Sequence, residues 1–173
     1  LTAPNGQAQQ GVLTGALEDA GLVAASLALS EAHGTGTALG DPIEAGSLAA
    51  AVLRKGGKLA FGGLKGNLAH GESTAGTSGI VTLSLQMRNR AAAPNAQLRA
   101  LNPHLGRTLR GTTCVLPEQP SGLHMMRAPG GGVSSFGYSG TIARAVLVVL
   151  AASLRSQRPP RPMLAYRRRA YHW

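Results

Sequence analysis

Apolar residues along the chain follow two alternating patterns. Short runs of consecutive apolar residues predict buried strands, whereas apolar residues that recur every three or four positions predict helices with one buried face. The helical pattern covers residues 9–20, 41–55 and 77–90. The strand pattern covers residues 24–29, 58–63, 112–116 and 145–151. Helices that alternate with strands in this way indicate an α/β fold.

Polar and small residues mark where the expected helices begin and end. Before the second helix, Asp41 is suited to the N-cap, Pro42 to the first helical position and Glu44 to a capping box. Gly21 follows the first helix, at the position where a left-handed conformation commonly ends a helix. Small residues within 75–79 would let the start of the third helix pack closely on a neighbouring element.

Three glycine-rich loops adjoin the expected strands, over residues 31–37, 64–76 and 130–141. The first two loops contain His33 and His70, respectively. Open α/β sheets place ligand sites where strands end in loops of this kind. Two neutral imidazoles that converge there could bind a carbonyl oxygen and stabilise the negative charge that develops on it.

Other polar side chains in these loops extend the possible site. Lys65 could tune the two histidines electrostatically, and the hydroxyls of Thr35 and Thr37 could hold an amide-bearing ligand. Each feature also has a simpler interpretation, because a loop histidine is more often a solvated or packing residue and Gly-Thr-Gly-Thr occurs in many turns. A metal site on the two histidines is conceivable, but no third ligand stands at a characteristic spacing.

The formal net charge of +10 is concentrated at one end of the chain. Six of the 17 basic residues lie in the last 22 positions, and residues 1–151 carry 11 basic against 7 acidic side chains, a net charge of +4. We therefore expect a domain over residues 1–151, an Arg- and Pro-rich linker over residues 152–173, and no nucleic-acid partner. The competing hypothesis is a nucleic-acid binder whose salt-sensitive affinity is lost when residues 152–173 are deleted.

Cysteine content and hydropathy restrict the remaining classes of protein. The single cysteine, Cys114, excludes an internal disulfide framework, which is compatible with a cytoplasmic location. Its apolar, strand-like surroundings favour an inert, packed thiol. No apolar run approaches the ~20 residues of a membrane span, so we expect no membrane association.

Four segments together resemble the β-ketoacyl synthase (ketosynthase) family of polyketide and fatty-acid synthases. Residues 31–37 match the family motif EAHGTGT at every position, and residues 1–6 match the segment LTAPNG. Residues 65–70 are similar to the motif KSNIGH, and residues 133–141 to VSSFGxSGT. The resemblance extends over about residues 1–150 and implies the C-terminal half of a thiolase-like fold, a mixed sheet with packed helices.

The resemblance implies decarboxylative Claisen condensation of acyl and malonyl thioesters. An acyl chain would move from the phosphopantetheine of an acyl carrier protein to an active-site cysteine, and the enolate formed from the malonyl thioester would attack it. The matching positions assign His33 and His70 to promoting decarboxylation and stabilising the enolate oxygen. Lys65 would support the two histidines.

The resemblance also implies substrate contacts but no cofactor or metal of the chain's own, because phosphopantetheine arrives on the carrier protein. Thr35 and Thr37 would bind the pantetheine arm. Phe136 and Tyr138 would shape the gate to the acyl pocket, and the backbone N–H of Tyr138 would join the oxyanion hole.

Departures from the family pattern keep a second hypothesis open. The family's nucleophile lies in a DTACSSS-type segment of the N-terminal half, which the 173 residues do not contain, and Cys114 matches no nucleophile position. Ile142 and Arg144 replace the family's Asn and His. We expect the chain to be inactive alone, to need the N-terminal half, to leave apolar surface uncovered without it, and to dimerise in the full domain. The alternative is a catalytically inactive ketosynthase-like scaffold or partner subunit.

Overall fold

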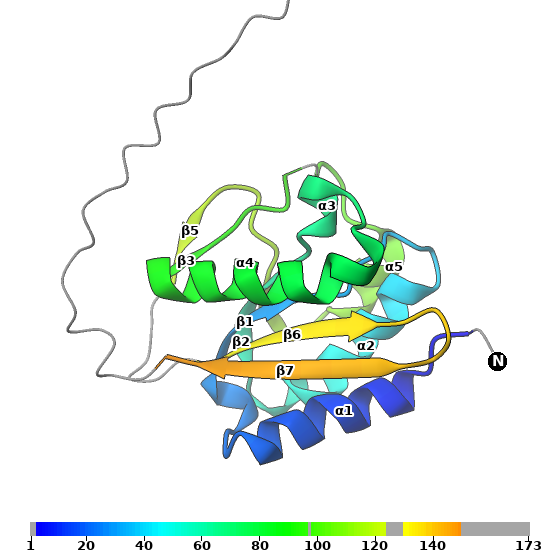
Figure 1. Ribbon diagram of the computed structural model, residues 1–173, viewed down its shortest axis with the longest axis horizontal. Coiled ribbons are helices and arrows are strands. Elements are labelled where there is room, and N and C mark those ends of the chain that lie inside the picture. The colour runs from blue at the N-terminus through cyan, green and yellow to red at the C-terminus, as the bar shows by residue number, and fades with distance from the viewer. Residues whose placement is uncertain (1–2, 97, 124–129, 150–173) are drawn as a thin grey trace, which may run out of the picture.

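The computed structural model describes residues 3–96, 98–123 and 130–149 (Figure 1). The linker predicted over residues 152–173 lies outside the described residues, as does the end of the strand predicted over residues 145–151. The elements in chain order are α1 (Gly6–Asp19), β1 (Leu27–Glu31), α2 (Gly40–Ala51), β2 (Lys58–Gly62), α3 (Lys65–Leu68), α4 (Ala75–Asn89), β3 (Ala91–Ala92), α5 (Pro103–Thr108), β4 (Thr113–Val115), β5 (Ser121–Gly122), β6 (Gly130–Phe136) and β7 (Ile142–Val148).

The main sheet of the described residues has five strands in the order β4-β2-β1-β6-β7. The first four strands are parallel, and β7 is antiparallel to β6 at one edge. Strands β3 and β5 form a separate antiparallel pair. The predicted α/β class and the mixed sheet with packed helices are therefore confirmed.

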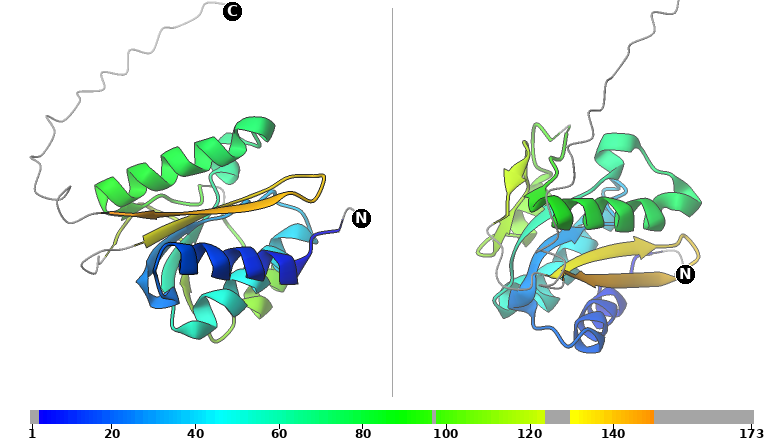
Figure 2. Two further views of the ribbon diagram at one scale, coloured as in Figure 1. Left: turned by 60° about the horizontal axis from the view of Figure 1, so that its bottom comes forward. Right: turned by 60° about the vertical axis from the view of Figure 1, so that its left-hand side comes forward.

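Helices cover both faces of the sheet, as Figure 2 shows: α1 and α2 lie on one face and α4 on the other. The α1/α2 side contains the larger apolar core, which includes Leu13, Leu48 and Val52. The α4 side contains a smaller core that includes Leu83 and Met87. Each face of the sheet is thus buried by a different helix layer, which is the arrangement expected of parallel strands.

Helix α1 follows the predicted pattern but begins earlier. The side chain of Asn5 caps it by accepting hydrogen bonds from the backbone N–H groups of Gln7 (3.0 Å) and Ala8 (3.1 Å). The buried residues of the helix include Leu13 and Leu17. Gly21 adopts φ +62°, as predicted for the residue beyond the helix end.

Close packing of α4 on β6 depends on glycine from both elements, as the small residues at the start of the helix predicted. A Cβ atom at Gly79 would lie 2.8 Å from Cγ2 of Val133, which is inside van der Waals contact. A Cβ atom at Gly131 would lie 2.7 Å from Sδ of Met87 and 2.8 Å from Cδ1 of Leu83. The helix and the strand therefore approach more closely than any residue with a side chain would permit.

The prediction that residues 130–141 form a loop is wrong for its first half, because Gly130–Phe136 is strand β6. Three glycines weaken a strand in isolation, but here they fit against side chains on both faces of the sheet. Strand β1 also differs from the prediction over residues 24–29. It runs to Glu31, and Ala24–Ser26 forms a 3₁₀ turn instead.

Helix α5 was not predicted, although the sequence contains its start signal. The side chain of Asn102 accepts a hydrogen bond from the backbone N–H of His104 (2.9 Å), and Pro103 occupies the first turn. An N-cap followed by proline is a common helix start. The helix is only 6 residues long, which is too short to show an apolar period.

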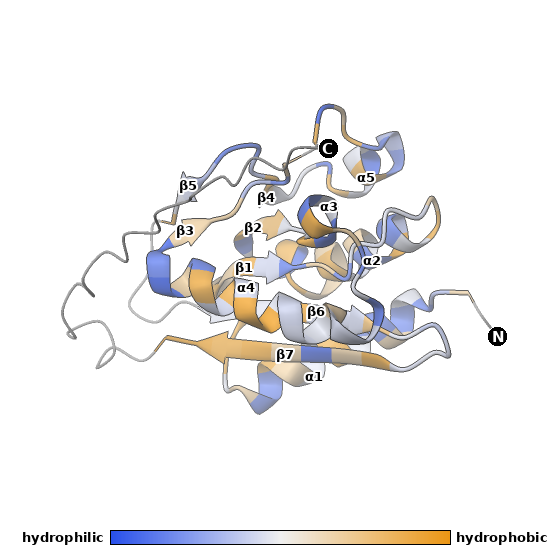
Figure 3. Cartoon of the chain, turned by 45° about the horizontal axis from the view of Figure 1, so that its top comes forward, coloured by the Kyte–Doolittle hydropathy of each residue, from blue (hydrophilic) through white to orange (hydrophobic). Residues whose placement is uncertain are grey.

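The outer face of α4 presents apolar side chains to solvent. Ile80, Val81 and Leu85 are 41%, 53% and 51% exposed. Figure 3 shows the apolar segments along this helix. In the part of the chain that the structure describes, no helix has the length and apolarity needed to cross a membrane.

Candidate active site

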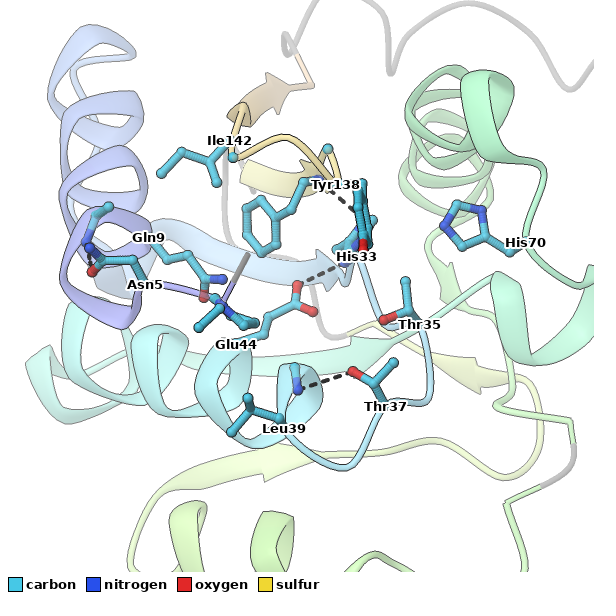
Figure 4. A pocket seen from close by; sticks show the side chains of 17 residues that line it. Asn5, Gln9, His33, Thr35, Thr37, Leu39, Glu44, His70, Tyr138 and Ile142 are labelled. Atoms are coloured by element: carbon cyan, nitrogen blue, oxygen red, sulfur yellow. Dashed lines mark hydrogen bonds between the residues drawn. The ribbon is translucent and has the colours of Figure 1, made fainter. Parts of the chain in front are cut away.

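The polar loops meet at one edge of the sheet, where three parallel strands end. The His33 loop follows β1, the segment with Lys65 and His70 follows β2, and Phe136 is the last residue of β6. A pocket of about 490 Å³ opens at this edge (Figure 4). Its lining includes six of the seven predicted site residues, namely His33, Thr35, Thr37, His70, Phe136 and Tyr138. The remaining residue, Lys65, is not part of the lining.

The two predicted histidines lie together over this pocket. Their ring centroids are 5.8 Å apart, and the ring planes are nearly perpendicular, at 84°. The Phe136 ring packs against His33 with a centroid distance of 5.3 Å. The loops that follow two different strands therefore bring both imidazoles to one place.

Each histidine accepts a backbone hydrogen bond at Nδ1. The N–H of Phe136 donates to Nδ1 of His33 at 3.2 Å, and the N–H of Glu72 donates to Nδ1 of His70 at 2.8 Å. An imidazole nitrogen that accepts a hydrogen bond carries no proton, so each neutral ring carries its proton on Nε2. The two Nε2–H groups are then available as donors to a ligand.

The surroundings of His33 keep its ring neutral at physiological pH. Burial lowers the pKa of His33 to about 4, and the electrostatic effects of the neighbouring Lys65 and His70 side chains act in the same direction. A neutral imidazole can stabilise an oxyanion without first losing a proton. A neutral ring is what the electrophilic role expected of the paired histidines would require, and that role stays a prediction.

The backbone before His70 is unusual. Ala69 adopts φ 68° and ψ 178°, a region that residues with a Cβ atom rarely occupy. Ala69 and His70 are both exposed. A hydrogen bond from the N–H of Glu72 holds the exposed His70 ring.

Glu44 has a different role from the one predicted, and the capping box is wrong. Its carboxylate accepts hydrogen bonds from the backbone N–H groups of His33 (2.7 Å) and Gly34 (2.9 Å). Asp41 is not the N-cap either, because its carboxylate accepts from the N–H of Gly36 at 3.1 Å. Both acidic residues therefore hold the loop that carries His33, and not their own helix.

Thr37 has a structural contact in addition to its predicted ligand role. Its Oγ1 accepts a hydrogen bond from the N–H of Gly40 (3.0 Å), the first residue of α2. Because an Oγ–H can donate while the oxygen accepts, the hydroxyl remains able to bind a ligand. Tyr138, in the turn after β6, is 89% exposed at the mouth of the pocket.

Glu31 and Lys65 form a second electrostatic link between loops. The buried carboxylate of Glu31 accepts a hydrogen bond from the N–H of Leu64 at 2.6 Å. Burial raises the pKa of Glu31 and lowers the pKa of Lys65, while the negative charges of Glu31 and Glu44 counter the lowering at Lys65. Lys65 thus lies in the field of both carboxylates that hold the site.

Asn95 also positions the site, although it was not singled out from the sequence. Its Oδ1 accepts from the N–H of Gly63 (3.1 Å), and its Nδ2 donates to the carbonyl oxygens of Phe61 (3.3 Å) and Pro117 (3.2 Å). These bonds fix the end of β2, from which the Lys65 segment begins. An asparagine that follows Pro94 carries no pattern from which this contact could have been predicted.

The remaining candidate chemistry lies away from the pocket. Cys114 belongs to β4, at the opposite edge of the sheet from β7, and burial raises the pKa of its thiol to about 11. A thiol of this kind is not a nucleophile at neutral pH. Within the described residues, no group of three or more His, Cys, Asp or Glu side chains could hold a metal ion.

Comparison with solved structures identifies the fold as thiolase-like. The chain superposes on an oxazolomycin ketosynthase domain of Streptomyces albus with a TM-score of 0.79 and 32% sequence identity, covering 91% of this chain and 28% of that one. A ketosynthase of the bacillaene polyketide synthase of Bacillus amyloliquefaciens gives a TM-score of 0.78 and 28% identity, covering 85% of this chain and 27% of that one.

The family follows from the sequence comparison. The profile of the β-ketoacyl synthase C-terminal domain matches residues 1–99, and the chain belongs to this family. Two curated relatives are each 39% identical: the spectinabilin polyketide synthase system protein NorA' of Streptomyces orinoci over 166 residues, and erythronolide synthase EryA2 of Saccharopolyspora erythraea over 171 residues. The matches cover 94% and 95% of this chain but only 5% of each relative.

Proposed function

We propose that this chain supplies the paired histidines of a β-ketoacyl synthase, which joins acyl and malonyl thioesters on acyl carrier protein by decarboxylative Claisen condensation. The proposal rests mainly on one observation. His33 and His70 lie 5.8 Å apart, and each accepts a backbone N–H at Nδ1, so both can present Nε2–H to one oxygen. Family membership supplies the reaction class.

The proposed reaction begins on a cysteine of the other half of the fold. Its thiolate attacks the acyl thioester and releases the carrier's pantetheine thiol. The malonyl thioester then loses CO₂, and the electron pair of the broken C–C bond forms an enolate. Nε2–H groups of His33 and His70 stabilise its oxygen. The enolate carbon attacks the acyl-cysteine carbonyl and forms the new C–C bond. The C–S bond of the acyl-cysteine then breaks and releases the cysteine thiolate.

The exposed apolar surface of α4 supports the proposal that a second half of the fold packs on this chain. Its outer face leaves Ile80, Val81 and Leu85 exposed, and contiguous apolar surface of this kind commonly marks an interface. The solved ketosynthase chains are about four times as long as the part that this chain matches. We propose that the cysteine-bearing half packs on this face of α4 and that the completed domain forms a homodimer.

Residues around the pocket mouth support the remaining substrate contacts. Thr35 and Thr37 lie on the side of the pocket nearest α2, where their hydroxyls can bind the amides of a pantetheine arm (Figure 4). Phe136 and Tyr138 flank His33 and form the proposed acyl gate. Phosphopantetheine is part of the carrier substrate, and the proposal requires no cofactor or metal of the chain's own.

The test is CO₂ release from malonyl-carrier protein by the ketosynthase assembled from this chain and a cysteine-bearing half. We expect His33→Ala and His70→Ala each to lower the rate at least 10²-fold, because each removes a donor to the enolate oxygen. His104→Ala is the matched control, since His104 is exposed on α5 and is not part of the pocket lining. Undiminished CO₂ release by either site variant would exclude the assigned roles.

The second candidate function is a catalytically inactive scaffold or partner subunit. The apolar Ile142 lines the pocket at the position where the family motif has asparagine, which removes a polar group from the site. This hypothesis predicts that His33→Ala leaves assembly and product output unchanged. The product yield of the assembled system therefore separates the two functions.

A further inference from the structure

Strand β7 contains one charged residue in an otherwise apolar segment. Figure 3 shows the hydrophilic band within β7, and Arg144 is the only charged residue of Ile142–Val148. Its Nη1 donates to Oγ of Ser134 on β6 (2.8 Å) and to Oγ of Ser30 on β1 (3.2 Å). Both serine side chains are buried. The arginine therefore extends from the edge strand across β6 and joins three strands of the sheet.

A glycine on β6 provides the space for this side chain. Gly132 pairs with Ser30 on β1 and with Val146 on β7. A Cβ atom at Gly132 would overlap the guanidinium of Arg144. The guanidinium thus takes the place of the side chain that Gly132 lacks, opposite Ser30.

The register of β1 against β6 is only weakly specified by the two strands themselves. Strand β6 begins with three consecutive glycines, which offer no side chains for cross-strand packing, and glycine-rich strands are prone to register slips. The pairing also contains an irregularity, because Leu27 pairs with Gly130 and Leu29 with Gly131. A side-chain contact that is compatible with only one register would therefore complement the backbone ladder.

This register matters for the site, because β1 and β6 lead to the two partners of one hydrogen bond. Phe136, the last residue of β6, donates its N–H to Nδ1 of His33 at 3.2 Å, and His33 follows the end of β1. Ser134 lies two residues before Phe136, and Ser30 three residues before His33. A slip of one residue between the strands would displace the N–H by about 3.3 Å and break this bond.

The other donors of Arg144 argue against a role in stability alone. Among the residues that the structure describes, the buried Nε and Nη2 atoms of Arg144 have no hydrogen-bond partner. A buried donor without a partner costs free energy, so the side chain stabilises the fold less than a fully bonded one would. The two bonds that Nη1 makes still specify which residues of β1 and β6 lie beside each other.

We propose that Arg144 is a positioning residue for His33: it fixes the register of β1 against β6 and so keeps the N–H of Phe136 on Nδ1 of His33. The catalytic meaning of this role rests on the proposed function. The link from Arg144 to the His33 hydrogen bond does not, and it can be measured without any acyl transfer.

The test is nitrogen NMR of the assembled ketosynthase with isotope-labelled histidine. A hydrogen bond at Nδ1 shifts the resonance of that nitrogen, and the loss of a signal in His33→Ala assigns it to His33. We expect Arg144→Met, which removes the donors, to move the His33 Nδ1 signal toward that of a nitrogen without a hydrogen bond. Arg144→Lys, which keeps a donor on a side chain of nearly the same length, should restore the wild-type position.

Serine variants separate this role from a general loss of packing. Ser134→Ala removes one acceptor of Arg144 and should move the His33 signal in the same direction as Arg144→Met. Ser135→Ala is the matched control on the same strand, because its Oγ lies on the opposite face, 3.2 Å from the position of a Cβ atom at Gly76 on α4. A His33 signal that stays in place in Arg144→Met and Ser134→Ala, or that moves equally in Ser135→Ala, would overturn the proposal. If Arg144→Met does not fold, the same comparison of Ser134→Ala with Ser135→Ala decides it.

The rate of CO₂ release provides the second measurement. We expect Arg144→Met to lower it by about tenfold or more, because small displacements of a catalytic group are costly, and Arg144→Lys to retain most of it. If wild type releases no CO₂, the proposed function fails, while the His33 signal still decides the role of Arg144.

Discussion

Substituting Ala69 by glycine should stabilise the protein, against the usual direction of an alanine-to-glycine change. Ala69 has φ 68° and ψ 178°, and a residue with a Cβ atom in such a region costs of order 1–3 kcal/mol. Glycine has no Cβ atom, but its greater freedom in the unfolded chain costs roughly 0.5–1 kcal/mol. Ala69 is exposed, so little packing is lost. The net expectation is a gain of about 1 kcal/mol.

The assay is denaturant unfolding of the assembled ketosynthase, with variants compared at equal protein concentration. Ala20→Gly is the matched control, because Ala20 is also exposed but has φ −79° and ψ −5°. We expect Ala20→Gly to lower the unfolding midpoint and Ala69→Gly to raise it. Loss of stability by both variants would refute the argument that the His70 segment contains a strained peptide. The family motif has glycine at this position, so we expect CO₂ release to be retained in Ala69→Gly.

Two further predictions concern packing and pH. Gly79→Ala should destabilise the protein by about 1–3 kcal/mol, because the added Cβ atom would lie 2.8 Å from Val133 in a tightly packed interface. The control is Gly11→Ala, which should not destabilise the protein because nothing lies within 4 Å of the added atom. Equal unfolding midpoints of the two variants would contradict this prediction. The folded-state pKa of His33 is lowered to about 4, so its contribution to stability is present above about pH 6.5 and is lost as the pH falls toward 4. Wild type should therefore lose more stability than His33→Gln between pH 7 and pH 4, and parallel curves would argue against a buried neutral ring.

The sequence was most informative where local pattern and packing agree. Leu13 and Leu17 repeat at the spacing of a helix face, and both are buried in α1. The alternation of helices and strands predicted the α/β class, which the structure confirms, but it did not predict the strand order β4-β2-β1-β6-β7. The site residues were predictable as a group because their loops come directly after those strands.

Residues that contact distant backbone were harder to predict. Glu44 looked like a capping residue because the local helix-start pattern is complete, yet its carboxylate binds the loop 10 and 11 residues before it. Asn95 binds Gly63 across 32 residues, which no local pattern reports. Strand β6 was missed because three consecutive glycines predict a turn, while their actual use depends on the close approach of α4 and Arg144. In each case a tertiary contact overrides the local propensity.

The close glycine contact between α4 and β6 also bears on the distance between the two histidine rings. His70 lies five residues before the start of α4, and β6 ends at Phe136, whose N–H binds His33. The packing of α4 on β6 therefore bears on the position of the segment that leads from His70 into the helix. A substitution that pushes α4 outward by the width of a methyl group would widen the gap between the imidazoles without touching either ring. Variation deep in this interface is thus a means of tuning, or of losing, the ability of two donors to share one oxygen.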